Sequence, residues 1–297
     1  MRFGGRRTSR NVEGRGGGFG GFGGGRGLGG GPMLFGLVFS RFGIGGIVVL
    51  FLVMMAIGGD PLGLSGGGQQ AVAPTQPAAR GADEECAEPG KRFLCQVLAS
   101  TEEQWGAAFA QAGTTYRPPT LVFYPGQVGT GCGEGQAAMG PFYCPADRRI
   151  YLDTSFFDEL AQRHGAPGDF AQAYVVAHEV GHHVQTLTGT AGAIRRAQAA
   201  VGGSEANALQ VRMELQADCY AGAWAARERG ALEPGDLEEG MRAASAIGDD
   251  TLQRAGRGYV VPESFTHGTA AQRRQALMRG WAGGGDPAAC DGYTTGI

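Results

Sequence analysis

The first 31 residues lack almost everything from which a hydrophobic core is built. They contain fifteen glycines and six arginines, and Glu13 is their one acidic residue. A segment of this composition cannot bury enough apolar surface to offset the entropy lost on folding. We therefore predict that residues 1–32 form a disordered, basic arm. Arginine–glycine steps are also typical of nucleic-acid-binding tails, but the apolar run that follows explains the charge better, and we expect no nucleic-acid partner.

The chain also lacks a C-x-x-C pair, the usual sign of a zinc site built from thiolates, although it contains six cysteines. All six follow residue 58, and an even number favours disulfide bonds in an exported domain. Proximity in the sequence favours the pairs Cys86–Cys95 and Cys132–Cys144, which leaves Cys219 for Cys290. The alternative is that these are reduced thiols buried in a cytosolic domain.

One long apolar run is present, and its composition differs from that of both neighbours. Met33–Ile57 is interrupted by Arg41 alone. A helix needs about 20 residues to cross roughly 30 Å of hydrocarbon, so we predict a transmembrane anchor over residues 33–57. Residues 1–57 carry a net charge of +6 and residues 58–297 carry −9, which favours a cytoplasmic amino terminus and a periplasmic or extracellular domain. A cleaved signal peptide is the alternative.

The rest of the chain divides into a tether and a folded domain. Residues 58–83 are rich in Gly, Pro, Gln and Ala and predict a flexible linker, followed by a domain over residues 84–297. Strands are predicted at residues 121–123 and 149–153, a turn-rich loop at 129–135, and helices at 105–112, 235–248 and 269–281. We predict that the strand at 149–153 is the sheet edge that receives a substrate backbone.

Residues 178–182 read His-Glu-Val-Gly-His within a strongly helical segment. Asp169 is a candidate cap for this helix and Gly189 a candidate stop. His178 and His182 are four residues apart, so their imidazoles lie on one face and can reach one metal ion. Glu179 lies beside them, where it can take the proton of an attacking water. The motif predicts a zinc site on a helix.

A second signal, Glu-Leu-Gln-Ala-Asp, follows at residues 214–218. The segment from Ser204 to Gly230 contains no proline and no glycine except Gly222, which predicts one long helix capped by Ser204. Glu214 is our candidate for the third zinc ligand, because a catalytic zinc ion has three protein ligands and one open position. Asp218, one turn later, is predicted to accept a hydrogen bond from His178. A solvated pair of surface acids is the alternative.

Two other histidines lie close to these signals. His267 precedes the last predicted helix, which Thr269 caps, and we predict that it donates a hydrogen bond to the oxyanion that develops during hydrolysis. A polar surface role is the alternative for this residue. His183 points about 100° away from His182 on the helix, and we predict that it is structural.

These residues resemble the putative neutral zinc metallopeptidase family of bacteria. The resemblance rests on residues 140–145, 151–153, 178–185, 214–222, 266–268 and 272–273, and covers most of residues 84–297. The pattern is similar to that of the gluzincin peptidases, and the Thr-His-Gly element resembles the Thr-His-Pro element of CaaX-processing proteases. It implies a zincin-like α+β fold, mainly helical with a small sheet, one zinc ion held by His178, His182 and Glu214, and Glu179 as general acid and base.

These features together predict a membrane-anchored zinc metallopeptidase. Its substrates would be peptides or proteins, and a zinc-activated water would hydrolyse the peptide bond with Glu179 as the base. Two alternatives remain open. The same residues could hydrolyse a non-peptide amide, such as a cell-wall bond, or the fold could be a scaffold without turnover.

Overall fold

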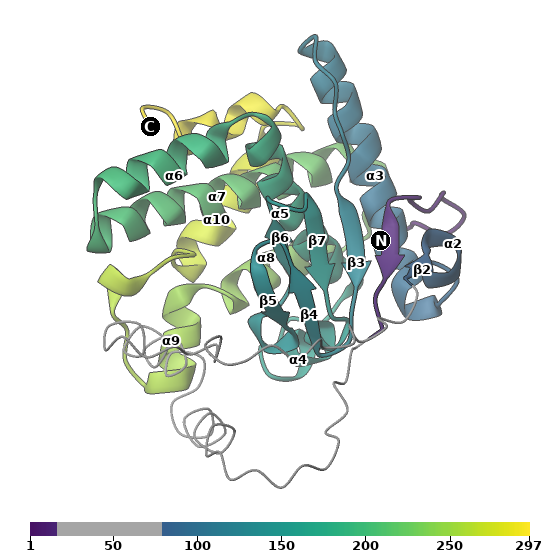
Figure 1. The fold of residues 1–297 in the computed structure, drawn as a ribbon, viewed down its shortest axis with the longest axis horizontal. Coiled ribbons are helices and arrows are strands. Elements are labelled where there is room, and N and C mark those ends of the chain that lie inside the picture. The colour runs from purple at the N-terminus through teal and green to yellow at the C-terminus, as the bar shows by residue number, and fades with distance from the viewer. Residues whose placement is uncertain (17–78) are drawn as a thin grey trace, which may run out of the picture. The chain divides into compact units, whose positions relative to one another are not determined.

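The computed structural model describes residues 1–16 and 79–297, in which helices pack on one side of a small mixed sheet (Figure 1). The predicted class, a helix-rich α+β fold with a small sheet, is confirmed. The anchor predicted over residues 33–57 lies outside the described residues, as does most of the predicted linker. Within residues 1–16 and 79–297, the structure contains no helix that is both long enough and apolar enough to cross a membrane.

The main sheet has five strands in the order β2-β1-β3-β7-β6. They are β1 (Val12–Gly14), β2 (Arg80–Gly81), β3 (Thr120–Phe123), β6 (Phe142–Cys144) and β7 (Arg149–Leu152). Neighbours β1, β3 and β7 are parallel, whereas β2 and β6 are antiparallel to their partners. The prediction that residues 149–153 form the sheet edge is wrong, because β6 lies outside β7. A strand of three residues is too short to be recognised from alternation.

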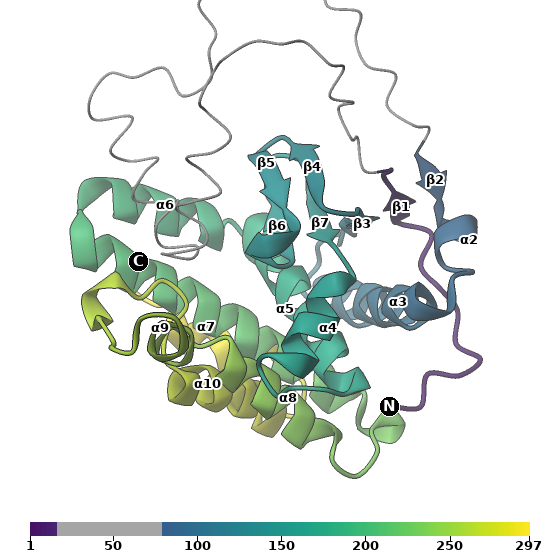
Figure 2. The same ribbon diagram turned by 90° about the horizontal axis from the view of Figure 1, so that it is seen from below.

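A two-stranded hairpin covers part of one face of the sheet (Figure 2). It comprises β4 (Gln127–Thr130) and β5 (Gly133–Gln136), where the sequence predicted a loop. Val128 of the hairpin packs with Tyr151 and Phe142 of the sheet. A Cβ atom at Gly135 would lie 2.6 Å from Cζ of Phe142, so a glycine is needed at this close approach.

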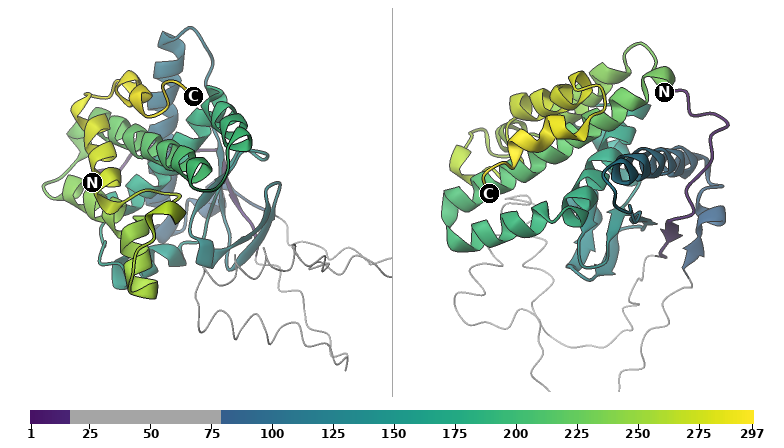
Figure 3. Two further views of the ribbon diagram at one scale, coloured as in Figure 1. Left: turned by 90° about the vertical axis from the view of Figure 1, so that its left-hand side faces the viewer. Right: turned by 90° about the horizontal axis from the view of Figure 1, so that it is seen from above.

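The helices lie on the other side of the sheet and beyond it (Figures 1 and 3). They are α2 (Ala82–Glu85), α3 (Pro89–Gln111), α4 (Ser155–Gln162), α5 (Asp169–Leu187), α6 (Thr190–Ala200), α7 (Gly203–Arg227), α8 (Asp236–Ala246), α9 (Asp249–Arg257) and α10 (Ala270–Ala282). Helix α5 packs against α3 and β6 and also against α7 and α8, so it joins the sheet to the helical layer.

The helix ends agree only in part with the sequence. Thr269 caps α10 and forms a capping box with Gln272, as predicted for its helix. Asp169 does not cap α5: the N-cap is Gly168, and a carboxylate oxygen of Asp169 lies 2.5 Å from the amino nitrogen of Met1. Ser204 does not cap α7 either, because that helix begins after Gly202. The N-cap residues of both helices are glycines, which have no side chain to cap the helix.

Residues 1–16 are not the disordered segment that the composition predicted. They form β1 and bury Phe3 and Val12. The prediction averaged the composition over 31 residues, but only four of the fifteen glycines lie within residues 1–16. The remainder of the predicted arm lies outside the described residues.

The three predicted disulfide pairs are confirmed. Cys86 is bonded to Cys95, Cys132 to Cys144 and Cys219 to Cys290. The first joins α2 to α3, and the second joins the hairpin to β6. The third joins α7 to the carboxyl-terminal segment across 71 residues of sequence.

We expect the third disulfide to contribute most to stability. Loop-closure entropy predicts a loss of about 4 kcal/mol when Cys219 and Cys290 are both replaced by alanine, and about 2.5–3 kcal/mol for either local pair. Urea unfolding of the purified variants, followed by tryptophan fluorescence, would measure the difference. A smaller loss for the long-range pair than for Cys86–Cys95 would contradict this ranking.

Candidate metal centre

Three donor atoms from two helices converge at one point. Nε2 of His178 lies 3.1 Å from Nε2 of His182 and 3.2 Å from Oε2 of Glu214, and Nε2 of His182 lies 3.4 Å from the same oxygen. A tetrahedral ion with bonds of about 2.1 Å has ligand atoms about 3.4 Å apart. The three donors therefore have the spacing of one face of a zinc tetrahedron. The structure brings together the three ligands that the sequence predicted.

Hydrogen bonds to the other ring nitrogens orient both histidines. Nδ1 of His178 lies 2.8 Å from Oδ1 of Asp218, and Nδ1 of His182 lies 2.9 Å from Oε1 of Gln185. Because both partner atoms are acceptors, each Nδ1 carries a proton, so Nε2 is the nitrogen that each ring would offer to a metal ion. The role of Gln185 was not predicted, although its position three residues after His182 is a usable signal.

Glu214 is held in its ionised form. Its Oε1 accepts a hydrogen bond of 2.9 Å from Nε2 of Gln210, which leaves Oε2 facing the two histidines. Burial alone would raise the pKa of this carboxyl group, but the contacts with His182 and His178 outweigh burial and hold the pKa well below its usual range. A carboxylate in this state suits zinc.

Asp218 orients His178 because its own oxygens are fully engaged. Its Oδ1 accepts hydrogen bonds from His178, Tyr174 and Arg273, and its Oδ2 accepts another from Arg273. Arg273 is 1% exposed. Burial would raise the pKa of Asp218, but the guanidinium outweighs it and lowers the pKa to about 2. The contact of Arg273 with Asp218 was not predicted from the sequence, in which the positive charge of Arg273 was the one signal for such a role.

A glycine in the motif lets the two ligand-bearing helices meet. A Cβ atom at Gly181 would lie 3.0 Å from Cα of Ala217 and 3.1 Å from its carbonyl oxygen. This is closer than nearly all real contacts of Cβ atoms, so a larger residue would push α7 away from α5. Glycine at 181 therefore allows Glu214 to reach the histidines.

Glu179 follows His178 on α5 and is 7% exposed. Burial raises the pKa of its carboxyl group, although the neighbouring histidines act in the opposite direction. A carboxylate with a raised pKa takes up a proton more readily at neutral pH. The position and environment of Glu179 are those of a general base beside the candidate metal site.

His267 lies on the loop before α10, where Asp249 fixes the backbone. Oδ2 of Asp249 accepts hydrogen bonds from the backbone N–H groups of Thr266, His267 and Gly268, and Oδ1 lies 3.4 Å from Nδ1 of His267. The hydrogen bond to Asp249 outweighs desolvation and raises the pKa of His267. The side chain is 51% exposed. Within the part of the chain that the structure describes, His267 makes no direct contact with the donor atoms of His178, His182 and Glu214. The role of Asp249 was not predicted from the sequence.

The contacts of His183 indicate a structural role. It is 0% exposed, and burial lowers its pKa to about 4. Its Nε2–H donates to the carbonyl oxygen of Arg117 over 2.6 Å, and its Nδ1 lies 3.0 Å from the hydroxyl of Tyr143 on β6. The neutral ring therefore connects the edge strand to α5 immediately after His182.

A second group of acids also has the spacing of a cation site. Asp169, Asp236 and Glu239 place carboxylate oxygens within 4.8 Å of one another. This group contains no histidine, and the amino nitrogen of Met1 lies 2.5 Å from Asp169 and 3.3 Å from Asp236. The chain itself supplies the positive charge there. Of the two groups found within residues 1–16 and 79–297, the first alone has the donors that zinc prefers.

Comparison with known proteins shows similarity to a zinc peptidase family. The pattern of a family described as putative neutral zinc metallopeptidase matches residues 1–293. An uncharacterized protein of Escherichia coli, YpfJ, is 47% identical over 302 residues, which cover 99% of each chain. An uncharacterized protein of Mycobacterium tuberculosis, Rv2575, is 43% identical over 68% of this chain and 72% of its own length. No solved structure matches the chain.

We expect the two acids of α7 to differ in zinc retention. Glu214→Ala removes a ligand atom and should nearly abolish zinc binding, whereas Asp218→Asn should weaken it by about 10–100-fold because only the orientation of His178 is lost. Glu205→Ala, an exposed acid on the same helix, is the matched control. Zinc content after dialysis against graded chelator would measure all three. Wild-type affinity in Glu214→Ala would mean that the roles are assigned wrongly.

Proposed function

The chain belongs to the putative neutral zinc metallopeptidase family, and we propose that it is a zinc-dependent peptidase with a zincin-like fold. The observation that carries the proposal is the convergence of His178, His182 and Glu214 at tetrahedral spacing, with Glu179 beside them. Such a donor set leaves the fourth position open for water or substrate, as in catalytic rather than structural zinc sites. We propose one zinc ion per chain.

The residues around the site would have different roles in hydrolysis. Zinc bound there would polarise the scissile carbonyl and lower the pKa of a water toward about 7. Glu179 would take the proton of the attacking water and pass it to the leaving amine, a task that its raised pKa favours. Asp218 and Gln185 keep the two imidazoles in the required tautomer. His267, held by Asp249, would donate a hydrogen bond to the developing oxyanion.

We propose that the substrate binds along the outer side of β6. No strand among the described residues pairs with that side, and an extended peptide can add to a free sheet edge through its backbone. Contacts with α5 support this choice: the Tyr143 hydroxyl of β6 donates to His183, which directly follows His182. The edge strand is thereby fixed relative to the metal site.

The compartment in which the domain works is proposed from its disulfides. Three bonds that use all six cysteines support an oxidising environment, the periplasm or the cell exterior. Attachment to a membrane through residues 33–57 stays a prediction from the sequence.

Replacing the general base separates binding from hydrolysis. Glu179→Gln preserves the shape of the side chain but cannot accept the proton, so we expect wild-type zinc content and a loss of at least about 100-fold in kcat. Casein and peptidoglycan are the substrates to compare. Casein cleavage supports the peptidase, and cleavage of peptidoglycan alone would favour an amide hydrolase. A zinc-loaded wild type that cleaves neither would favour a scaffold.

His267→Ala tests the oxyanion role. We expect kcat to fall by about 100–1,000-fold, as when one oxyanion donor is removed elsewhere, while zinc content and KM change little. His164→Ala, in the segment after α4, is the control for loss of a histidine. Unchanged kcat in His267→Ala would leave this residue with a surface role only.

A further inference from the structure

The amino-terminal segment (residues 1–16) is built into the interior of the main sheet. Its strand β1 pairs with β3 on one side, in parallel, and with β2 on the other. The pairing continues beyond the strand, because the N–H of Leu121 donates to the carbonyl of Asn11 and the N–H of Arg15 to that of Phe123. The segment therefore provides backbone partners that the domain would otherwise lack at this position.

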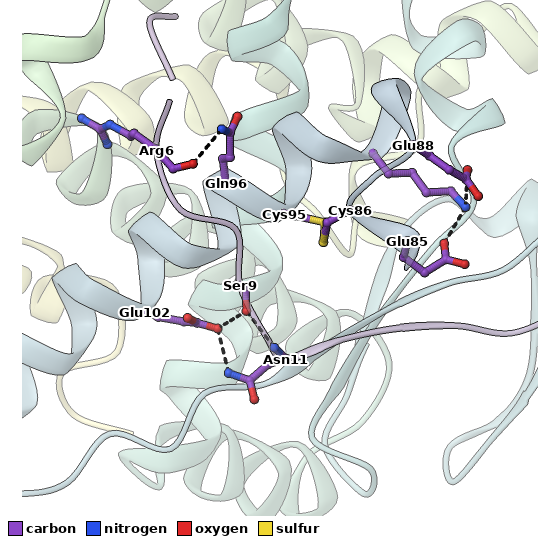
Figure 4. Close-up of a disulfide and its surroundings, with 10 residues drawn as sticks. Arg6, Ser9, Asn11, Glu85, Cys86, Glu88, Cys95, Gln96 and Glu102 are labelled. Carbon is purple, nitrogen blue, oxygen red and sulfur yellow. Dashed lines mark hydrogen bonds and ion pairs between the residues drawn. A yellow bond between two sulfur atoms is a disulfide. The ribbon is translucent and has the colours of Figure 1, made fainter. Parts of the chain in front are cut away.

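Side chains of α3 form hydrogen bonds with several residues of the amino-terminal segment (Figure 4). The carboxylate of Glu102 accepts hydrogen bonds from Ser9 Oγ and, over 2.8 Å, from Asn11 Nδ2. The amide of Gln96 donates to the carbonyl oxygen of Arg6 over 3.0 Å. Ser9 is 1% exposed. These are specific polar contacts made in a water-poor interface, where an unmatched partner is costly.

The same interface includes a disulfide-bonded helix. The N–H of Ser9 donates to the carbonyl oxygen of Cys95, and Cys95 is bonded to Cys86 (Figure 4). Elsewhere in the segment, Arg6 forms an ion pair of 2.6 Å with Glu228, whose side chain is nearly buried. The amino-terminal segment thus contacts α3, early in the domain, and Glu228, the residue that follows α7 late in the domain.

We propose that the domain has a strand-shaped docking groove whose occupant is the chain's own amino-terminal segment, and that both therefore lie in one compartment. Neighbouring strands are about 4.8 Å apart, whereas the hydrocarbon core of a bilayer is about 30 Å thick. A single membrane crossing anywhere between residues 17 and 78 would separate β1 from β3. This proposal replaces the cytoplasmic amino terminus that the charge difference favoured.

Charge does not oppose the docked arrangement. Two of the five arginines of residues 1–16, which the positive-inside rule would assign to the cytoplasm, have acidic partners in the domain. Arg7 contacts Glu102 and Glu103, and Arg6 contacts Glu228. The docked position therefore pairs Arg6 and Arg7 with acids of the domain.

Two single-cysteine variants of the full chain test the compartment. All native cysteines are bonded, so Arg10→Cys in the segment and Arg274→Cys on α10 each add one exposed thiol. Spheroplasts that express either variant would be treated with a membrane-impermeant maleimide before and after lysis. We expect the two thiols to behave alike. Reaction of one thiol in intact spheroplasts, with the other reacting after lysis alone, would overturn the proposal.

Docking itself needs a second measurement, because two segments can share a compartment without touching. Ser9→Ala combined with Asn11→Ala removes two hydrogen bonds to Glu102, and we expect the Tm of the purified full chain to fall by about 4–8 °C. Arg10→Ala, an exposed neighbour, is the matched control and should shift Tm by less than about 1 °C. Equal Tm values for the double variant and the control would mean that the groove is empty in solution.

Discussion

The ion pair between Arg273 and Asp218 is the contact on which the candidate metal site depends. Two charges are stable in a protein interior only when they are paired and fully hydrogen-bonded. Nε and one terminal nitrogen of Arg273 each donate to Asp218 over 2.9 Å, and the Tyr174 hydroxyl adds a further bond. The carboxylate so held accepts a hydrogen bond from the Nδ1–H group of His178. Arg273 on α10 thus sets the tautomer of His178, a candidate ligand on α5, through Asp218 on α7.

This ion pair requires α7 and α10 to approach each other closely, and glycines allow it. A Cβ atom at Gly280 would lie 1.9 Å from the carbonyl oxygen of Cys219, and one at Gly222 would lie 2.0 Å from that of Leu277. Neither position can hold a larger side chain without separating the helices. The Cys219–Cys290 disulfide fixes the same part of α7. Backbone contact, a disulfide and a buried charge pair therefore act together one to two turns beyond Glu214.

Spacing along one helix explains which parts of the site could be predicted. His178 and His182, like Glu214 and Asp218, are separated by one turn, so the sequence fixes their relative positions. As the sequence predicted, Glu214 faces the Nε2 atoms of the two histidines, whereas Asp218 contacts Nδ1 of His178 and is held there by Arg273. Arg273 and Asp249 were missed because tertiary packing, which no local pattern encodes, brings them to the site.

The sheet was harder to predict because its strands are short and come from distant parts of the chain. β1 has three residues and β2 has two, and a glycine-rich context concealed the first. Their positions determine which sheet edge can serve the site. β1 and β2 extend the sheet on the side of β3, so the opposite edge is β6, and that strand contacts α5. The amino-terminal segment thus helps to define the edge at which we propose that substrate binds.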